Sequence, residues 1–218
     1  MKISLTMDKL INYLAKQLSF HFPDDADLSV LTSIVPKAII RLSFCFENTN
    51  YTAYWRDNFC FFNYLNADQY LVFLYFCSRV SFEELNINLA TKFFYLNKIL
   101  HSFHCMYDTI LPDIFLVVHG SGIVLGKATY HNYSVFMHGC TVGANSKFEI
   151  PTLGKLLFMY PNSSITGNCF IDENCCLSNG AHVNDEVLPP NSLVFGSSPY
   201  LTVKTNRRNR LSHVYQID

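Results

Sequence analysis

Two histidines in the C-terminal half of the chain lie in similar glycine-containing segments, His119-Gly-Ser-Gly and His138-Gly-Cys-Thr, nineteen residues apart. An imidazole suits proton transfer at neutral pH because its ordinary pKa is about 6.5. The spacing is close to three steps of six residues, so the two side chains would share a face of a chain that winds in such steps. None of the eight cysteines forms a Cys-x-x-Cys pair, so the sequence predicts neither a zinc site nor a redox centre.

A step of six residues organises the chain from Val118 to Val187, and it restarts once, at Leu153. The apolar residues at this step are Val118, Val124, Tyr130, Phe136, Val142, Leu153, Met159, Ile165, Ile171, Leu177 and Val183. Four residues after each of them comes a second column, in which only Leu157 is large. A large apolar residue followed four residues later by a small one, repeated every six residues, does not fit the 3.6-residue period of a helix. The pattern predicts a solenoid of short strands with an apolar interior and tight corners. Ordinary antiparallel strands are the alternative, but turns would then reset the phase.

The first 112 residues predict a different structure. Helical spacing begins at Asp8, a cap precedes a helix over residues 70–80, and Ser81-Phe-Glu-Glu is typical of a capping box that opens the next helix. We therefore predict an α+β protein. Its expected parts are a helical domain over residues 1–112, a β-solenoid domain over 113–203 and a basic C-terminal tail over 204–218.

Composition argues against several classes of partner. The formal net charge is -1, with 15% charged and 50% hydrophobic residues, so neither nucleic acid nor an anionic membrane is expected as the main partner. Asp8 and Lys9 interrupt the apolar residues near the N-terminus, where a signal peptide would have an uninterrupted apolar core. No apolar run reaches membrane-spanning length. We expect a cytoplasmic protein without a membrane span.

Three segments resemble the serine-acetyltransferase branch of the hexapeptide-repeat acyltransferases. They are His119-Gly-Ser-Gly-Ile-Val-Leu-Gly-Lys-Ala, Phe136-Met-His-Gly-Cys-Thr-Val-Gly143 and Leu188-Pro-Pro-Asn-Ser-Leu-Val-Phe-Gly-Ser-Ser-Pro199. Within that branch, the run from Tyr95 through Leu111-Pro-Asp-Ile-Phe to His119 is most similar to O-acetyltransferases of bacterial capsule or O-antigen sugars, including sialic acid. The resemblance covers roughly residues 90–205. It implies a left-handed parallel β-helix, a homotrimer, and acetyl-CoA as co-substrate at the edge between subunits.

The resemblance also implies roles for particular residues. His119 matches the catalytic base, which takes a proton from the acceptor hydroxyl as this attacks the thioester. Asp113, His138 and Asn145 are candidates for orienting that histidine or contacting the acceptor, although Asp113 is nearer in sequence than the aspartate of serine acetyltransferases. The expected coenzyme A contacts are Gly143, Pro161, Asn179, Gly196, Ser197, Ser198, Lys204 and Arg207.

The loop between Val142 and Leu153 bears on the acceptor. In serine acetyltransferases this loop carries a histidine just before the proline, whereas here Ile150 precedes Pro151. We therefore predict an acetyl-CoA-dependent O-acetyltransferase, without a metal, whose acceptor is a saccharide of the bacterial capsule or lipopolysaccharide. Two alternatives stay open: a serine O-acetyltransferase, and a non-catalytic trimeric β-helix scaffold.

Overall fold

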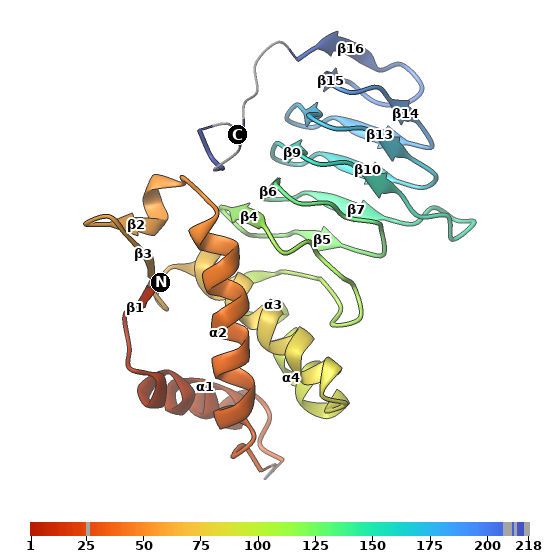
Figure 1. Cartoon of the computed structure of the whole chain (residues 1–218). Helices are drawn as coiled ribbons and strands as arrows, with labels where there is room; N and C mark the ends of the chain where they lie inside the picture. The colour runs from red at the N-terminus through yellow and green to blue at the C-terminus, as the bar shows by residue number, and fades with distance from the viewer. Residues whose placement is uncertain (25–26, 207–210, 212, 216–218) are drawn as a thin grey trace.

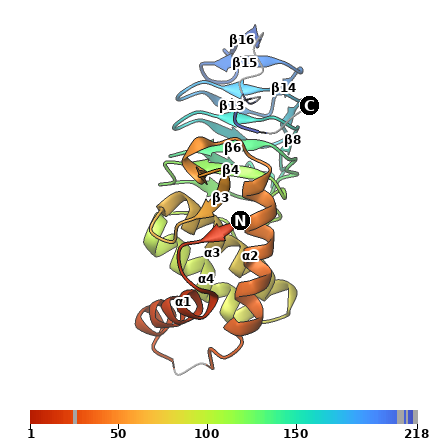
Figure 2. The same cartoon turned by 60° about the vertical axis from the view of Figure 1, so that its left-hand side comes forward.

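The chain folds into a block of helices followed by a stack of short parallel strands (Figure 1). The computed structural model describes residues 1–24, 27–206, 211 and 213–215. The strands wind into a solenoid of about four turns, and the helices lie against its first turn (Figure 2). The fold class predicted from the sequence is confirmed. None of the helices within the described residues has the length and apolar character that a membrane crossing requires.

The N-terminal block contains four α-helices in the part of the chain that the structure describes. They are α1 (Met7–His21), α2 (Leu31–Glu47), α3 (Ala67–Glu83) and α4 (Ile87–His101). Helix α3 is the central one, because it is buried continuously from Gln69 to Ser81 and packs against α2 and α4. A turn of 3-10 helix, η1 (Thr52–Tyr54), and the strands β2 (Trp55–Arg56) and β3 (Phe59–Phe62) come between α2 and α3 in the chain. The strand β1 (Lys2–Ile3), which precedes α1, pairs with β3 and completes a small sheet.

The capping box predicted at Ser81 is wrong, because Ser81 lies inside α3. Its side chain is buried and its hydroxyl donates to the Cys77 carbonyl at 2.8 Å, which is the bond a serine makes within a helix. The next helix begins instead after Asn86, whose side chain accepts the N–H of Leu89. Asparagine is a favoured N-cap because its oxygen satisfies an N–H that has no partner within the helix.

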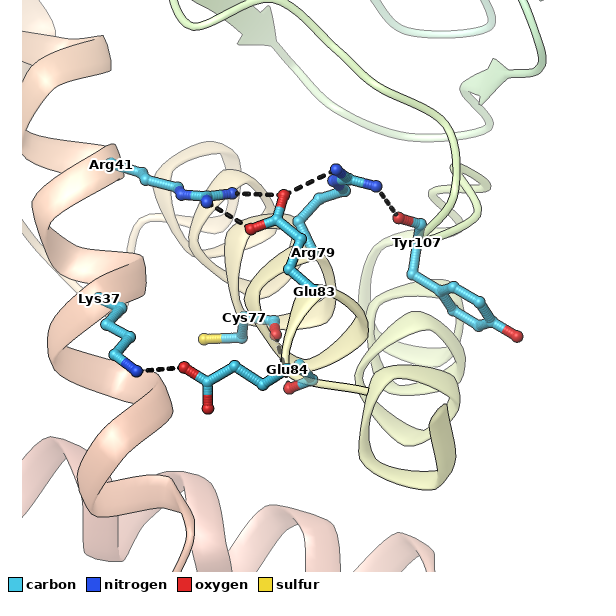
Figure 3. A network of polar contacts seen from close by, with 8 residues as sticks. Lys37, Arg41, Cys77, Arg79, Glu83, Glu84 and Tyr107 are labelled. Atoms are coloured by element: carbon cyan, nitrogen blue, oxygen red, sulfur yellow. Dashed lines mark hydrogen bonds and ion pairs between the residues drawn. The ribbon is translucent and has the colours of Figure 1, made fainter. Parts of the chain in front are cut away.

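Polar contacts tie α3 to its neighbours (Figure 3). Arg79 donates to the Tyr107 carbonyl at 2.6 Å and to the Glu83 carboxylate at 2.7 Å, and Arg41 of α2 binds the same carboxylate. Arg79 is almost fully buried. A buried guanidinium is tolerated only when it is paired in this way, so the segment that leads into the solenoid is fixed to α3.

The solenoid has three parallel sheets, which we call its first, second and third faces. The first face contains β4 (Phe115–Val118), β6 (Ser134–Met137), β9 (Phe158–Met159), β12 (Cys176–Leu177) and β15 (Ser192–Phe195). The second contains β5 (Val124–Leu125), β7 (Thr141–Gly143), β10 (Ser164–Thr166) and β13 (His182–Asn184), and the third β8 (Thr152–Leu153), β11 (Phe170–Ile171) and β14 (Val187–Leu188). The last strand, β16 (Thr202–Thr205), pairs antiparallel with β15.

The predicted interior column is confirmed from Phe136 to Val183, where all its members are buried. It is wrong by one residue at Val118 and Val124, because Val117 and Leu125 face the interior in their place. The reason is an enlarged first corner. Eight residues separate these two interior positions, whereas six separate the equivalent pairs of later turns, such as Phe136 and Val142.

The corners explain the column of small residues. At most corners a residue with positive φ directly precedes a small buried one. These pairs are Tyr133-Ser134, Gly139-Cys140, Asn162-Ser163, Asn174-Cys175, Gly180-Ala181 and Asn191-Ser192. Asparagine and glycine tolerate the left-handed conformation best. Two members of the predicted column do not fill corners, since Ser146 lies in a loop and Val187 is exposed.

The described end of the chain returns to the junction between helices and solenoid. The Tyr215 side chain is fully buried and its hydroxyl donates to the Ser134 carbonyl at 2.6 Å. The N–H of Asn50 donates to the Val214 carbonyl at 2.7 Å. The region expected as a tail therefore begins inside β16, and part of it packs on the first two turns.

Ala181→Leu tests the corner packing. Because Ala181 is fully buried at a tight corner, the larger side chain should lower the free energy of unfolding by about 1–3 kcal/mol, measured by thermal unfolding. Ala144→Leu is the control, since Ala144 is exposed in a loop and should tolerate leucine. An equal effect of the two substitutions would contradict this account of the corners.

Candidate active site

His119 lies in the enlarged first corner, directly after β4. Its backbone is left-handed, with φ of 56°, and its side chain is exposed. Gly120 follows, and a Cβ there would lie 2.7 Å from Val117 Cγ1 and 2.8 Å from Leu71 Cδ1, so a larger residue would require these side chains to shift. The corner is therefore pressed against α3, and the imidazole is presented at its outer side.

Asp68, in the first turn of α3, holds this corner. Its carboxylate accepts the N–H of His119 at 2.9 Å and the N–H of Gly120 at 2.7 Å. Asp68 is not among the site residues predicted from the sequence. No periodic signal could have found it, because Asp68 precedes His119 by 51 residues and belongs to the helical block.

The register places His138 beside His119 on the next turn, since Val118 pairs with Met137. Neighbouring strands are about 4.8 Å apart, so the two histidines follow one another along one edge of the solenoid, as their spacing predicted. The same register continues this edge through Pro161, Asn179 and Gly196. Four predicted site residues thus extend the row that starts at His119.

A second row lies along the opposite edge of the second face. Gly143 pairs with Thr166, which pairs with Asn184. The hydroxyl of Ser198 accepts the N–H of Asn184 at 3.0 Å on this edge, whereas Ser197 bridges to His182 at the other end of the same strand. The residues expected to contact coenzyme A therefore border the second face on both sides.

The other predicted residues lie elsewhere. Asp113 precedes β4 while His119 follows it, so the four-residue strand, about 13 Å long, separates them. The Asn145 amide is engaged by its own loop and by Asp185, to which its nitrogen donates at 2.9 Å. Lys204 is exposed on β16, with its ammonium 5.5 Å from the centre of the Phe195 ring. Arg207 lies outside the described residues.

A half-buried histidine, His101, lies near Asp68. Burial lowers the pKa of His101 to about 4, and the nearby Asp68 carboxylate opposes this only in part. Its Nδ1 lies 2.8 Å from Asn97 Oδ1, and its ring packs against Tyr70. Near neutral pH the His101 imidazole is therefore uncharged.

Among the described residues, no group of three or more histidine, cysteine or acidic side chains is arranged to hold a metal ion.

Comparison with solved structures shows the same fold. No protein-family model matches the sequence, and no curated protein matches it significantly. A serine acetyltransferase from Brucella abortus strain S19 is 15% identical with a TM-score of 0.70, over 92% of this chain and 84% of that one. The Neisseria gonorrhoeae serine acetyltransferase in complex with serine is 21% identical with a TM-score of 0.67, over 90% and 84%. The soybean serine acetyltransferase apoenzyme is 16% identical with a TM-score of 0.65, over 90% of each chain.

His101 predicts a pH dependence of stability. An unfolded histidine takes up a proton near its ordinary pKa of about 6.5, whereas folded His101 stays neutral down to about 4. The unfolded state therefore binds more protons in this window, and stability falls as the pH decreases through it. We expect this residue to contribute about 1–2 kcal/mol of loss between pH 7 and pH 5.

Urea unfolding of His101→Gln at several pH values measures the contribution. Stability should fall less steeply from pH 7 to pH 5 in this variant than in the wild type. His131→Gln serves as the control, because His131 is exposed. Parallel stability curves for wild type and His101→Gln would show that His101 is not the group responsible.

Proposed function

We propose that the chain is an acetyl-CoA-dependent O-acetyltransferase with His119 as its general base. The observation that carries the proposal is the likeness to serine acetyltransferases over about nine-tenths of the chain, helices and solenoid together. The exposed imidazole at the enlarged first corner supports it, because His119 lies at the end of a row of predicted coenzyme A contacts.

In the proposed reaction, His119 removes the proton of the acceptor hydroxyl as its oxygen attacks the thioester carbonyl. Backbone N–H groups stabilise the oxyanion of the tetrahedral intermediate. The carbon–sulfur bond then breaks, the acetyl group stays on the acceptor oxygen, and the thiolate takes up the proton. No covalent bond to the protein forms. The two rows that border the second face would bind coenzyme A, with Lys204 and Arg207 as partners for its phosphates.

L-serine is the acceptor that the comparisons support best. The similar structures are of serine acetyltransferases, and the one from Neisseria gonorrhoeae contains serine. A capsule or lipopolysaccharide sugar is the second candidate. It is favoured by Ile150, which is 45% exposed at the position where serine acetyltransferases carry a histidine. A cytoplasmic location stays a prediction.

Thiol release from acetyl-CoA distinguishes the acceptors. The purified protein is assayed with L-serine and, separately, with sialylated and other capsular oligosaccharides. Release with serine supports the first acceptor, and release with an oligosaccharide but not with serine supports the second. If the protein binds no coenzyme A, the proposed function is wrong and the scaffold alternative is favoured.

His119→Ala tests the general base. We expect kcat to fall at least about 100-fold, because proton removal from the hydroxyl loses its acceptor. Coenzyme A binding, measured by calorimetry, should stay within about twofold of the wild type, since the backbone contacts are unchanged. His131→Ala is the matched control, because His131 is an exposed histidine on a different corner, with Nδ1 2.7 Å from the Leu153 carbonyl. Near-normal turnover of His119→Ala would remove His119 from the mechanism.

We also propose a homotrimer, with the third face at the contact between subunits. Phe170 and Val187 pair on neighbouring strands of this face and are 50% and 72% exposed. Ile150, on the loop just before β8 of the same face, is also exposed. Apolar side chains gathered on one exposed face are typical of a protein contact.

Phe170→Glu tests this contact. A charge at the centre of an apolar interface costs enough to dissociate it, so the mass by light scattering should fall from three times 25.0 kDa towards one. Leu65→Glu is the control, because Leu65 is 72% exposed in the loop before α3, away from the solenoid. A trimeric Phe170→Glu variant would contradict the proposed interface.

A further inference from the structure

We infer that Asp68 is a positioning residue of the proposed reaction: by binding the backbone of His119 and Gly120, its carboxylate fixes the direction of the His119 imidazole. The inference rests on the proposed role of His119. It starts from an unusual contact, in which one carboxylate receives two successive backbone N–H groups, one on each oxygen, at 2.9 and 2.7 Å. Hydrogen bonds to an ionised acceptor are stronger than neutral ones, and the paired geometry adds direction.

The need for this contact follows from the place of the corner in the stack. At later turns, a corner N–H donates to the carbonyl of the turn before it: Gly139 to Ser121 at 2.8 Å, Asn162 to His138 at 3.0 Å and Gly180 to Pro161 at 2.9 Å. The first corner has no preceding turn. Asp68 provides the acceptors that a preceding turn would have provided. At this point α3 therefore takes the place of a preceding turn in the hydrogen bonding of the solenoid backbone.

The enlarged corner makes the contact matter for His119 in particular. This corner is two residues longer than the equivalent later corners, and within it His119 adopts a left-handed backbone that residues with a Cβ disfavour. Such a conformation persists only when the surroundings determine it. The Asp68 carboxylate is what holds the His119 and Gly120 N–H groups here, and Leu71 and Val117 close the space beside Gly120.

Asp68 is itself held firmly. It lies in the first turn of α3, where the helix dipole stabilises a negative charge. Its neighbour Gln69 is buried, receives the N–H of Asn63 at 2.7 Å and donates to the Phe61 carbonyl at 2.8 Å. The helix start therefore has little freedom to move. A rigid support of this kind keeps a general base within the narrow range of directions that proton transfer requires.

Asp68→Asn tests the inference with little change in size. The amide keeps one acceptor but turns an NH2 group towards one of the two N–H donors, so the corner should lose its fixed direction. We expect kcat to fall about 10- to 100-fold, with the KM for acetyl-CoA within about twofold of the wild type. Asp8→Asn is the matched control, because Asp8 is an exposed acidic residue in the first turn of α1 and the substitution removes the same charge.

A double-mutant cycle separates positioning from general destabilisation. If Asp68 acts through His119, then Asp68→Asn should cause no further loss of kcat in the His119→Ala background. An equal loss in both backgrounds would overturn the inference, as would a wild-type kcat for Asp68→Asn. If Asp68→Asn does not fold, Asp68→Glu takes its place, because it keeps the charge but is too long for the same paired contact. A wild-type kcat for that variant overturns the inference too.

The same measurements separate this inference from the proposed function. If His119→Ala keeps near-normal turnover, the proposed base is wrong, and the role of Asp68 in positioning it fails with it. If His119→Ala loses turnover but Asp68→Asn does not, the general base stands and only the positioning role is wrong.

Discussion

A stack of parallel strands leaves unpaired backbone groups at both ends, and the rest of this structure depends on how those ends are closed. At the far end, β16 pairs antiparallel with β15. At the near end, the backbone of His104 pairs with Ile123 and Leu125, and Asp68 receives the N–H groups beside it. The helical block is thus the structure that terminates the solenoid, which explains why it lies directly under the first turn (Figure 1).

The closure at the near end extends along the whole of α3. Besides Asp68 at its start, the Tyr75 hydroxyl accepts the N–H of Leu111 at 2.8 Å and donates to the Thr109 carbonyl at 3.1 Å. Arg79, one turn further, binds the Tyr107 carbonyl. The Tyr75 and Arg79 side chains are buried, and their polar groups are hydrogen-bonded, which is the condition for placing them between two packed layers. One helix therefore fixes both the approach to β4 and the corner that follows it.

The structure could be predicted from the sequence where the environments of the residues repeat, and not where a residue depends on a contact that occurs once. From Phe136 to Val183 every turn presents the same apolar interior, so residue type and spacing were sufficient to predict the interior column. The prediction was wrong at Val118 and Val124 because the first corner is held by a contact across 51 residues, for which one sequence carries no signal. It was wrong at Ser81 because burial of a long helix outweighed a local cap.

The regularity of the solenoid also limits what it can recognise. Identical turns present identical backbone groups, which suits an extended co-substrate such as coenzyme A but does not select one hydroxyl among many. Selection needs groups that occur once, and two interruptions provide them. One is the first corner with His119 and Asp68; the other is the loop after β7, in which Asn145 reaches Asp185 beyond the end of β13. The first corner and this loop lie at opposite edges of the second face. Under the proposed function these two interruptions select the acceptor, and the regular second face between them sets the distance that separates them.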